Sequence, residues 1–229
     1  MDWNAAKVSL QLAAWTCVLL LPVGLMLGRW LAWSQRRHRP VIEALLLLPL
    51  LLPPTVLGFY LLQALAPVSW LGSLLARLFG GPLAFSFPGI LIASLLINLP
   101  FAVQPMQRAF EAVPPDVREA AWVSGLSSFE TFRRIELPLA WSGIVSGMAL
   151  VFAHTLGEFG VILMVGGSIP GETKTLSIAI YDRVQAFRDG EAAMMSAVLL
   201  AFSLAVLLLL YVTAGRPRPV RTAARIDRT

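Results

Sequence analysis

The side chains that most often carry enzyme chemistry are sparse in this sequence. It contains two histidines, His38 and His154, and one cysteine, Cys17, so no cluster has the composition or spacing of a metal site. A Gly-x-Ser-x-Gly nucleophile turn is absent, and so is the Gly-x-x-x-x-Gly-Lys phosphate loop of ATP-binding proteins. We therefore expect no catalytic residue, no metal ion and no cofactor bound by this chain. An enzyme is disfavoured.

Three polar side chains stand within otherwise apolar segments, and each has two interpretations. A carboxylate such as Glu158 is costly at the end of an apolar segment and often has a function there. Glu158 is therefore a candidate gate, or else a structural cap or a docking contact. Asn98 and Gln104 are candidate pathway residues, or else they form hydrogen bonds between helices. We expect a pathway lined by small, hydroxyl and amide groups, because a tight anion site would trap its ligand.

Membrane-spanning helices must position these residues. The 229-residue chain is 57% hydrophobic and 14% charged, whereas soluble domains are about 25% charged. Five uncharged runs have 21 to 33 residues, and a spanning helix needs about 20. The sequence predicts an all-α integral membrane protein with five transmembrane helices, near residues 8–33, 43–66, 86–107, 139–165 and 193–213. A sixth short span around 66–85 would invert part of this topology.

Small residues and prolines distinguish three of these predicted helices. The Gly24-x-x-x-Gly28 spacing marks close helix packing, or it reflects only the abundance of small residues in membrane helices. Prolines should kink or unwind the second and third helices, inside a bundle or along a cavity. These prolines are Pro49, Pro53 and Pro54 in the second helix and Pro88, Pro100 and Pro105 in the third.

The distribution of basic residues predicts the orientation. With five spans, 13 of the 18 lysines and arginines fall on one side of the membrane. The positive-inside rule then places the N-terminus outside and the basic tail, residues 214–229, in the cytoplasm. We expect this tail to contact lipid headgroups. We do not expect it to bind nucleic acid.

The segment 108–138 is charged and amphipathic, unlike its surroundings. Pro115 suits the first turn of a short helix, and Gly125 suits its end. Ser127 and Glu130 have the spacing of a capping box, which predicts the start of a second short helix. The segment is expected to end at Pro138, just before the fourth span. It is therefore predicted to be a helix–Gly–helix element.

The second short helix carries an apolar stripe at Phe129, Phe132 and Ile135. Such a stripe can anchor a partner protein in a groove. It can equally lie on the membrane surface, and periodicity alone does not separate the two.

The residues of this loop resemble the signature of permease subunits of ATP-binding-cassette (ABC) importers. Glu119-Ala120-Ala121 is followed after three residues by Gly125, after nine more by Ile135, and after one more by Leu137-Pro138. The resemblance implies a type I ABC importer permease fold in which this loop docks onto an ATPase subunit. The implied coupling residues are Glu119, Ala120, Ala121, Gly125, Ile135, Leu137 and Pro138.

Three further stretches resemble the molybdate permeases within the molybdate/sulfate permease family. They are residues 48–58, 156–160 and 169–175, and the likeness covers residues 8–213, which we take as the transmembrane domain with its coupling loop at 108–138. Sulfate and thiosulfate permeases share the Gly-Glu-aromatic-Gly element of 157–160 in looser form. The resemblance implies molybdate import, with sulfate, thiosulfate or tungstate as the alternative.

The resemblance also implies the partners and the cellular location. A homodimer of this chain would assemble with two cytoplasmic ATPase subunits, which bind ATP and Mg²⁺, in a bacterial inner (plasma) membrane. A periplasmic molybdate-binding protein would deliver the anion. A proton- or sodium-coupled carrier is the competing class, but it needs titratable groups deep in the spans. Only Glu158 and His154 are candidates for that role.

Overall fold

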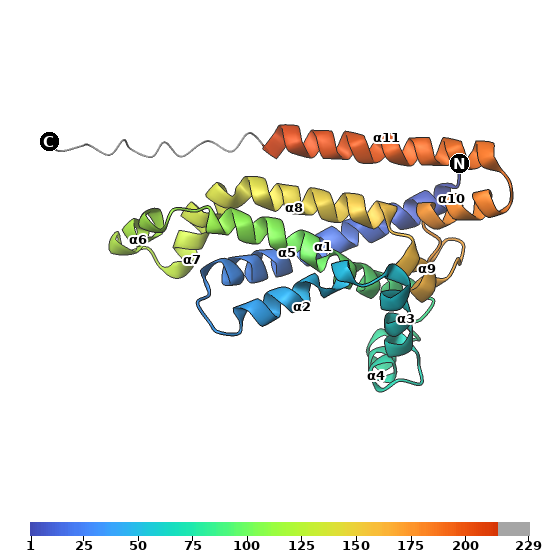
Figure 1. Cartoon of the computed structure of the whole chain (residues 1–229), viewed down its shortest axis with the longest axis horizontal. Helices are drawn as coiled ribbons and strands as arrows, with labels where there is room; N and C mark the ends of the chain where they lie inside the picture. Colours follow the sequence, from blue (N-terminus) through green and yellow to red (C-terminus); the bar gives the residue numbers. More distant parts are fainter. Residues whose placement is uncertain (215–229) are drawn as a thin grey trace.

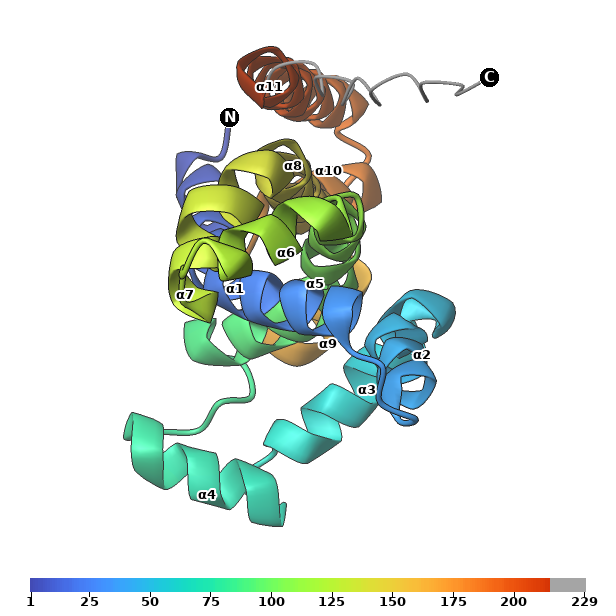
Figure 2. The same ribbon diagram turned by 90° about the vertical axis from the view of Figure 1, so that its left-hand side faces the viewer.

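The computed structural model describes residues 1–214, and every regular element in that part is a helix. Four long helices run side by side along the molecule (Figure 1). Figure 2 shows the same bundle from one end. The four are α1 (Trp3–Trp33), α5 (Phe87–Glu111), α8 (Leu137–Gly157) and α11 (Asp189–Ala214). The predicted all-α class is therefore confirmed.

The number of spans depends on how one bent helix pair is counted. Four helices in the described residues are long and apolar enough to cross a membrane. Helices α2 (Arg39–Leu51) and α3 (Pro54–Leu65) qualify only together, and they bend by 107°. Counting this pair as one broken span gives the predicted five. Helix α4 (Trp70–Phe79) has ten residues and is too short to be a sixth span.

The bend between α2 and α3 follows from two consecutive prolines. A proline disfavours the helical conformation of the residue before it. Leu52 precedes Pro53, and Pro53 precedes Pro54, and both Leu52 and Pro53 are extended, with ψ of 138° and 137°. Pro54 then occupies the first turn of α3, where its missing N–H costs nothing. The predicted break in the second helix is confirmed.

The third helix was predicted to kink or unwind at its prolines, and it does not unwind. Helix α5 runs from Phe87 to Glu111 without interruption through Pro100 and Pro105. Pro88 lies in its first turn, where proline fits without loss of a hydrogen bond. Helix α5 packs against both α1 and α8, and internal prolines are tolerated in membrane helices that neighbouring helices enclose.

The fourth predicted helix, 139–165, is two helices instead of one. Helix α8 ends at Gly157, and the separate α9 (Gly160–Gly166) follows. Glu158 between them is extended, and its carboxylate accepts a hydrogen bond from the Val161 N–H at 3.1 Å. The apolar run is continuous in the sequence, so hydrophobicity alone does not reveal this break.

Glycines allow α5 to pack closely between α1 and α8. A Cβ added at Gly24 of α1 would lie 2.9 Å from the Met106 sulfur, and one at Gly28 would lie 3.0 Å from the Gln107 backbone nitrogen. The close packing predicted for this Gly-x-x-x-Gly pair is confirmed. Helix α8 presents a second such pair, Gly143 and Gly147, to the other side of α5. That pair was not predicted from the sequence.

The two ends of the bundle carry different elements. One end holds α6 (Pro115–Val123), α7 (Ser128–Thr131) and the connection from α1 to α2 (Figure 1). The opposite end holds the N-terminus, α9 and α10 (Leu176–Gln185). Helix α3 packs on α9, where a Cβ at Gly58 would lie 2.7 Å from that of Met164. Residues 215–229 of the basic tail lie outside the described residues, and so does their predicted lipid contact.

Candidate functional site

The helix–Gly–helix element forms as predicted. Helix α6 begins at Pro115 and has its C-cap at Ser124, and Gly125 then takes a left-handed conformation with φ of 84°. The Leu126 N–H donates to the Ala121 carbonyl at 3.1 Å, and the Gly125 N–H donates to the Trp122 carbonyl at 2.9 Å. This is the Schellman arrangement, and it makes the turn between the two short helices rigid.

The second short helix begins with the predicted capping box. The Ser127 hydroxyl accepts from the Glu130 N–H at 3.2 Å, and the Ser127 N–H donates to the Glu130 carboxylate at 3.0 Å. The Ser127 N–H and the Ser127 hydroxyl, at 2.9 Å, both donate to the Glu130 carboxylate and hold the pKa of Glu130 below its ordinary value. The cap therefore contributes stability at neutral pH, which is lost as the pH falls through that lowered pKa.

Helix α7 continues into α8 through one wide turn, and this corrects the prediction that Pro138 ends the element. Residues Phe132–Glu136 form a π-helical turn, in which the Leu137 N–H donates to the Phe132 carbonyl. Pro138 has no N–H, and its ring would clash with the carbonyl four residues earlier. Widening the turn relieves this clash. The coupling loop is thus joined to a membrane helix with no flexible linker.

A buried carboxylate ties the loop to α1. Glu136 is fully buried, and its oxygens accept from Arg29 of α1 and from Arg118 of α6, the latter at 2.8 Å. The Arg118 guanidinium also lies 3.7 Å from the centre of the Trp33 ring. This triad was not predicted from the sequence. The available signal was a charged residue between the two apolar motif positions Ile135 and Leu137 at the edge of a span.

The side chains of the loop divide into an inner and an outer set. Phe132 turns inward, with its ring 6.3 Å from that of Phe110 and the Arg29 guanidinium 5.3 Å above it. Phe129, by contrast, is 69% exposed and Val123 is 90% exposed. Of the signature residues, Ala121 and Leu137 are at least partly buried, as is Ile135. The exposed ones are Glu119, Ala120, Gly125 and Pro138.

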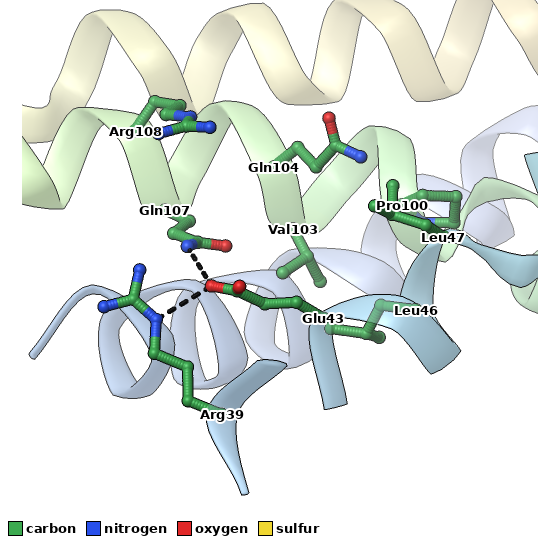
Figure 3. Close-up of a pocket in the computed structure, with 9 residues that line it drawn as sticks. All are labelled: Arg39, Glu43, Leu46, Leu47, Pro100, Val103, Gln104, Gln107 and Arg108. Atoms are coloured by element: carbon green, nitrogen blue, oxygen red, sulfur yellow. Dashed lines mark hydrogen bonds and ion pairs between the residues drawn. The ribbon is translucent and has the colours of Figure 1, made fainter. Parts of the chain in front are cut away.

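A polar cleft of about 340 Å³ opens between α2 and α5 near the same end of the bundle. Figure 3 shows Arg39 and Glu43 reaching from α2 toward Gln107 on α5. Gln104, a predicted pathway residue, also lines the cleft. The expected amides are therefore present, but two arginines and a glutamate accompany them. The full lining comprises Arg39, Glu43, Leu46, Leu47, Pro100, Val103, Gln104, Gln107 and Arg108.

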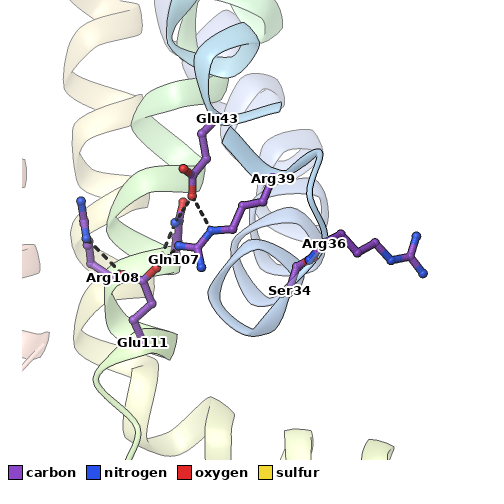
Figure 4. Close-up of polar contacts among 7 residues, drawn as sticks. All are labelled: Ser34, Arg36, Arg39, Glu43, Gln107, Arg108 and Glu111. Atoms are coloured by element: carbon purple, nitrogen blue, oxygen red, sulfur yellow. Dashed lines mark hydrogen bonds and ion pairs between the residues drawn. The ribbon is translucent and has the colours of Figure 1, made fainter. Parts of the chain in front are cut away.

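Ion pairs and hydrogen bonds cross this cleft from helix to helix (Figure 4). Arg39 donates to Glu43 at 2.8 Å on its own helix and to Glu111 of α5 at 2.7 Å. The Gln107 amide donates to Glu43 at 2.8 Å and to Glu111 at 3.0 Å. Arg108 completes the network with a 3.2 Å hydrogen bond to Glu111. Two arginines and two glutamates take part, so the charges of this network balance.

Asn98 lies away from this cleft. It is fully buried, its amide donates to the Ser94 carbonyl at 2.8 Å, and its carbonyl lies 3.0 Å from His154 Nδ1 on α8. His154 also stacks on Phe101 with a ring separation of 4.4 Å. This geometry supports the interpretation in which Asn98 forms a hydrogen bond between two helices, here α5 and α8.

Glu158 likewise makes local contacts. One carboxylate oxygen accepts from the Val161 N–H at the start of α9, and the other lies 3.7 Å from His154 Nε2. The side chain is 10% exposed. These contacts support a role for Glu158 in capping α9.

Comparison with known proteins places this arrangement in a family. The family model described as the inner membrane component of binding-protein-dependent transport systems matches residues 21–218. The molybdenum transport system permease protein of Azotobacter vinelandii is 43% identical, with 92% of this chain and 93% of that protein covered. A protein of Chlorella vulgaris described as a probable sulfate transport system permease is 31% identical, with coverages of 90% and 77%.

A solved structure supports the fold. The bacterial ABC transporter involved in alginate import matches with a TM-score of 0.75 at 17% identity, covering 92% of this chain and 78% of its own. The sequence relatives are named as transport permeases, which confirms the prediction of a transport subunit instead of an enzyme. Because the family model matches most of its length, the chain belongs to the binding-protein-dependent transport system inner membrane components.

Proposed function

We propose that this chain is the membrane-spanning subunit of an ATP-driven importer that carries molybdate into the cytoplasm. The observation that carries the proposal is the 43% identity, over 92% of the chain, to a permease named for molybdenum transport. The rigid connection from the α6–α7 loop to α8 supports it, because an importer needs such an element to pass movement from an ATPase to the spans.

In this proposal two ATPase subunits bind ATP and Mg²⁺, and two copies of this chain form the pathway. The coupling loop offers the exposed apolar side chain of Val123 as an anchor for a groove on the ATPase. A periplasmic binding protein delivers the oxyanion to the opposite end. ATP binding then shifts the population of the spans between inward-facing and outward-facing states.

The proposed orientation places the α6–α7 end in the cytoplasm and the N-terminus outside, in a bacterial inner membrane. Arg36, Arg37, Arg133 and Arg134 all belong to the α6–α7 end, in agreement with the positive-inside rule. The cleft with Gln104 then lies on the cytoplasmic half of the pathway. Asn98 joins α5 to α8 through His154, and Glu158 caps α9.

Sulfate is the second candidate substrate. The likeness to a probable sulfate permease favours it, at lower identity than the molybdenum relative. Both anions are tetrahedral dianions, so a weakly binding pathway would pass either one. The choice between them is expected to rest mainly on the binding protein.

Uptake of labelled molybdate tests this function. Cells lacking the chain should lose uptake, and restoring the chain should return it. Excess tungstate should block the restored uptake, whereas excess sulfate should not. Equal inhibition by sulfate would move the assignment to sulfate. If neither molybdate uptake nor sulfate uptake depends on the chain, both candidate substrates are refuted.

Gly125 provides a test of the coupling loop. With φ of 84°, any other L-residue is strained there, although a Cβ would meet no atom within 4 Å. We expect Gly125→Val to cost about 1–2 kcal/mol locally and to weaken binding of the ATPase in a pull-down assay.

Gly171 is the matched control, since it has φ of 79° and equally open space but lies between α9 and α10. Gly171→Val should carry the same strain and leave ATPase binding intact. If both variants bind the ATPase as the native chain does, the result contradicts the proposed coupling role of the α6–α7 turn.

The Glu158→Gln variant distinguishes between the two proposed roles of Glu158, a cap of α9 and a gate of the pathway. Glutamine keeps an oxygen that can accept from the Val161 N–H, so we expect normal assembly and normal uptake. Glu158→Ala removes the acceptor and should lower the stability by about 1 kcal/mol in thermal unfolding. Loss of uptake by Glu158→Gln in a normally assembled transporter would instead establish a gate.

A further inference from the structure

Two cavities adjoin at the α6–α7 end of α1 and differ in polarity. The first, here called the basic pocket, has about 320 Å³ and is lined by Arg29, Trp30, Trp33, Ser34, Gln35, Arg36 and Arg118. The second, here called the apolar groove, has about 500 Å³ and is lined by Leu25, Met26, Arg29, Trp30, Ser128, Phe129 and Phe132. Arg29 and Trp30 belong to both linings, so the two cavities are neighbours along α1.

The basic pocket carries an excess of positive charge. Among the described residues that line it are three arginines and no carboxylate. Glu136 contacts Arg29 and Arg118 from the buried side, which leaves a local net charge of +2. Arg36 is exposed, and no ion pair holds its side chain among the described residues. Figure 4 shows that it points away from the network around Arg39.

The surroundings place both cavities at the edge of a membrane. Leu19, Val23 and Met26 form an exposed apolar stripe along α1, at 40%, 39% and 73% exposure. At helical spacing this stripe leads to Trp30, and tryptophan is enriched where a span meets the membrane surface. A ligand in the two cavities would therefore have its polar part beside the arginines and its apolar part along the lipid-facing side of α1.

We propose that these cavities bind one anionic phospholipid. Its phosphodiester contacts Arg36 in the basic pocket, with Arg29 and Arg118 adding positive charge, and an acyl chain lies in the apolar groove against Met26. Charge-assisted hydrogen bonds from guanidinium groups to phosphate oxygens are strong and geometrically specific. The bound lipid would brace α1 against α6 and α7. The inference needs only a membrane-embedded bundle, so it does not depend on the substrate.

Other kinds of ligand would fill only one of the two cavities. A soluble oxyanion would use the basic pocket and leave the apolar groove empty. An apolar segment of a partner protein would use the groove and leave three arginines unmatched. A molecule with one negative headgroup and long apolar chains matches both cavities and their order along α1.

Native mass spectrometry of the assembled transporter, stripped of lipid in detergent, tests the proposal. The transporter is titrated with phosphatidylglycerol and with phosphatidylcholine of the same acyl chains. We expect tighter binding of phosphatidylglycerol and about a fivefold loss of that binding in Arg36→Gln. Arg37→Gln is the matched control, because it removes the same charge one residue away, outside the lining. It should leave the binding essentially unchanged.

Four results would overturn the proposal. Equal binding of the two lipids would remove the role of the charge. Equal losses in Arg36→Gln and Arg37→Gln would indicate general surface attraction. Displacement of phosphatidylglycerol by millimolar inorganic phosphate would assign the pocket to a soluble anion. Binding that appears only after the ATPase is removed would assign the groove to that partner.

Discussion

A Glu136→Gln variant is expected to assemble poorly and to separate ATP hydrolysis from transport. Glu136 is fully buried between Arg29 and Arg118, and removing one member of a buried ion pair costs about 3–5 kcal/mol. We expect a cost at the lower end of this range, because the Arg29 side chain is 31% exposed and can recover some hydration. Since the triad joins α1 and α6 to the start of α8, we expect uptake per ATP hydrolysed to fall on the order of tenfold.

Glu191→Gln is the control for this variant. Glu191 lies in the first turn of α11 at the opposite end of the bundle and pairs with Arg183 at 3.1 Å, but its side chain is 51% exposed. An exposed ion pair of this kind contributes little to stability. Thermal unfolding, ATPase activity and uptake should therefore remain near native values in the control. Native coupling in Glu136→Gln would show that the triad is not part of the transmission path.

The second large effect is expected at the contact between α5 and α8. A Cβ at Gly143 would lie 2.3 Å from the Ala109 Cβ and 2.9 Å from the Pro105 carbonyl oxygen. Neither helix can yield easily, because α5 is also packed against the glycines of α1. Gly143→Ala should destabilise the protein by about 1–3 kcal/mol, measured as a lower unfolding temperature in detergent. Larger residues at this position should prevent assembly.

A second glycine on α8, Gly157, serves as a control that distinguishes the steric clash from the effect of alanine on helix propensity. Gly157 ends α8, and a Cβ added there would meet no atom within 4 Å, so Gly157→Ala should be neutral or slightly stabilising. Adding Ala109→Gly to Gly143→Ala removes one side of the clash and should recover part of the loss. Equal stability of Gly143→Ala and Gly157→Ala would contradict the close approach of α5 and α8.

Local signals in the sequence were sufficient for the first helix of the coupling loop, its glycine turn and the start of the second helix. Gly125, the Ser127 capping box and Pro115 each act through neighbouring backbone groups, so their pattern predicts the helix ends without knowledge of the rest of the fold. The break at Pro53 was predictable for the same reason. The excess of apolar residues likewise predicted the helical membrane class, because a bilayer leaves few alternatives.

The features that the sequence did not reveal depend on contacts distant in the chain. The Glu136 carboxylate is 107 residues from Arg29, and no periodicity connects them. Helix α5 stays continuous through Pro100 and Pro105 because its neighbours enclose it, which local rules cannot include. The break after Gly157 lies within an apolar run whose hydrophobicity is consistent with one longer helix. The pairing of Gly143 with Ala109 requires the relative position of two helices.

Reconstituted transport most directly tests whether this chain forms an ATP-driven permease. The assembled transporter is placed in liposomes with ATP on the side of the α6–α7 loop and molybdate-loaded binding protein on the other. Uptake should require both ATP and the binding protein, and it should persist after ionophores abolish the proton and sodium gradients. Uptake that proceeds without ATP and stops when those gradients are abolished would contradict the account and identify an ion-coupled carrier.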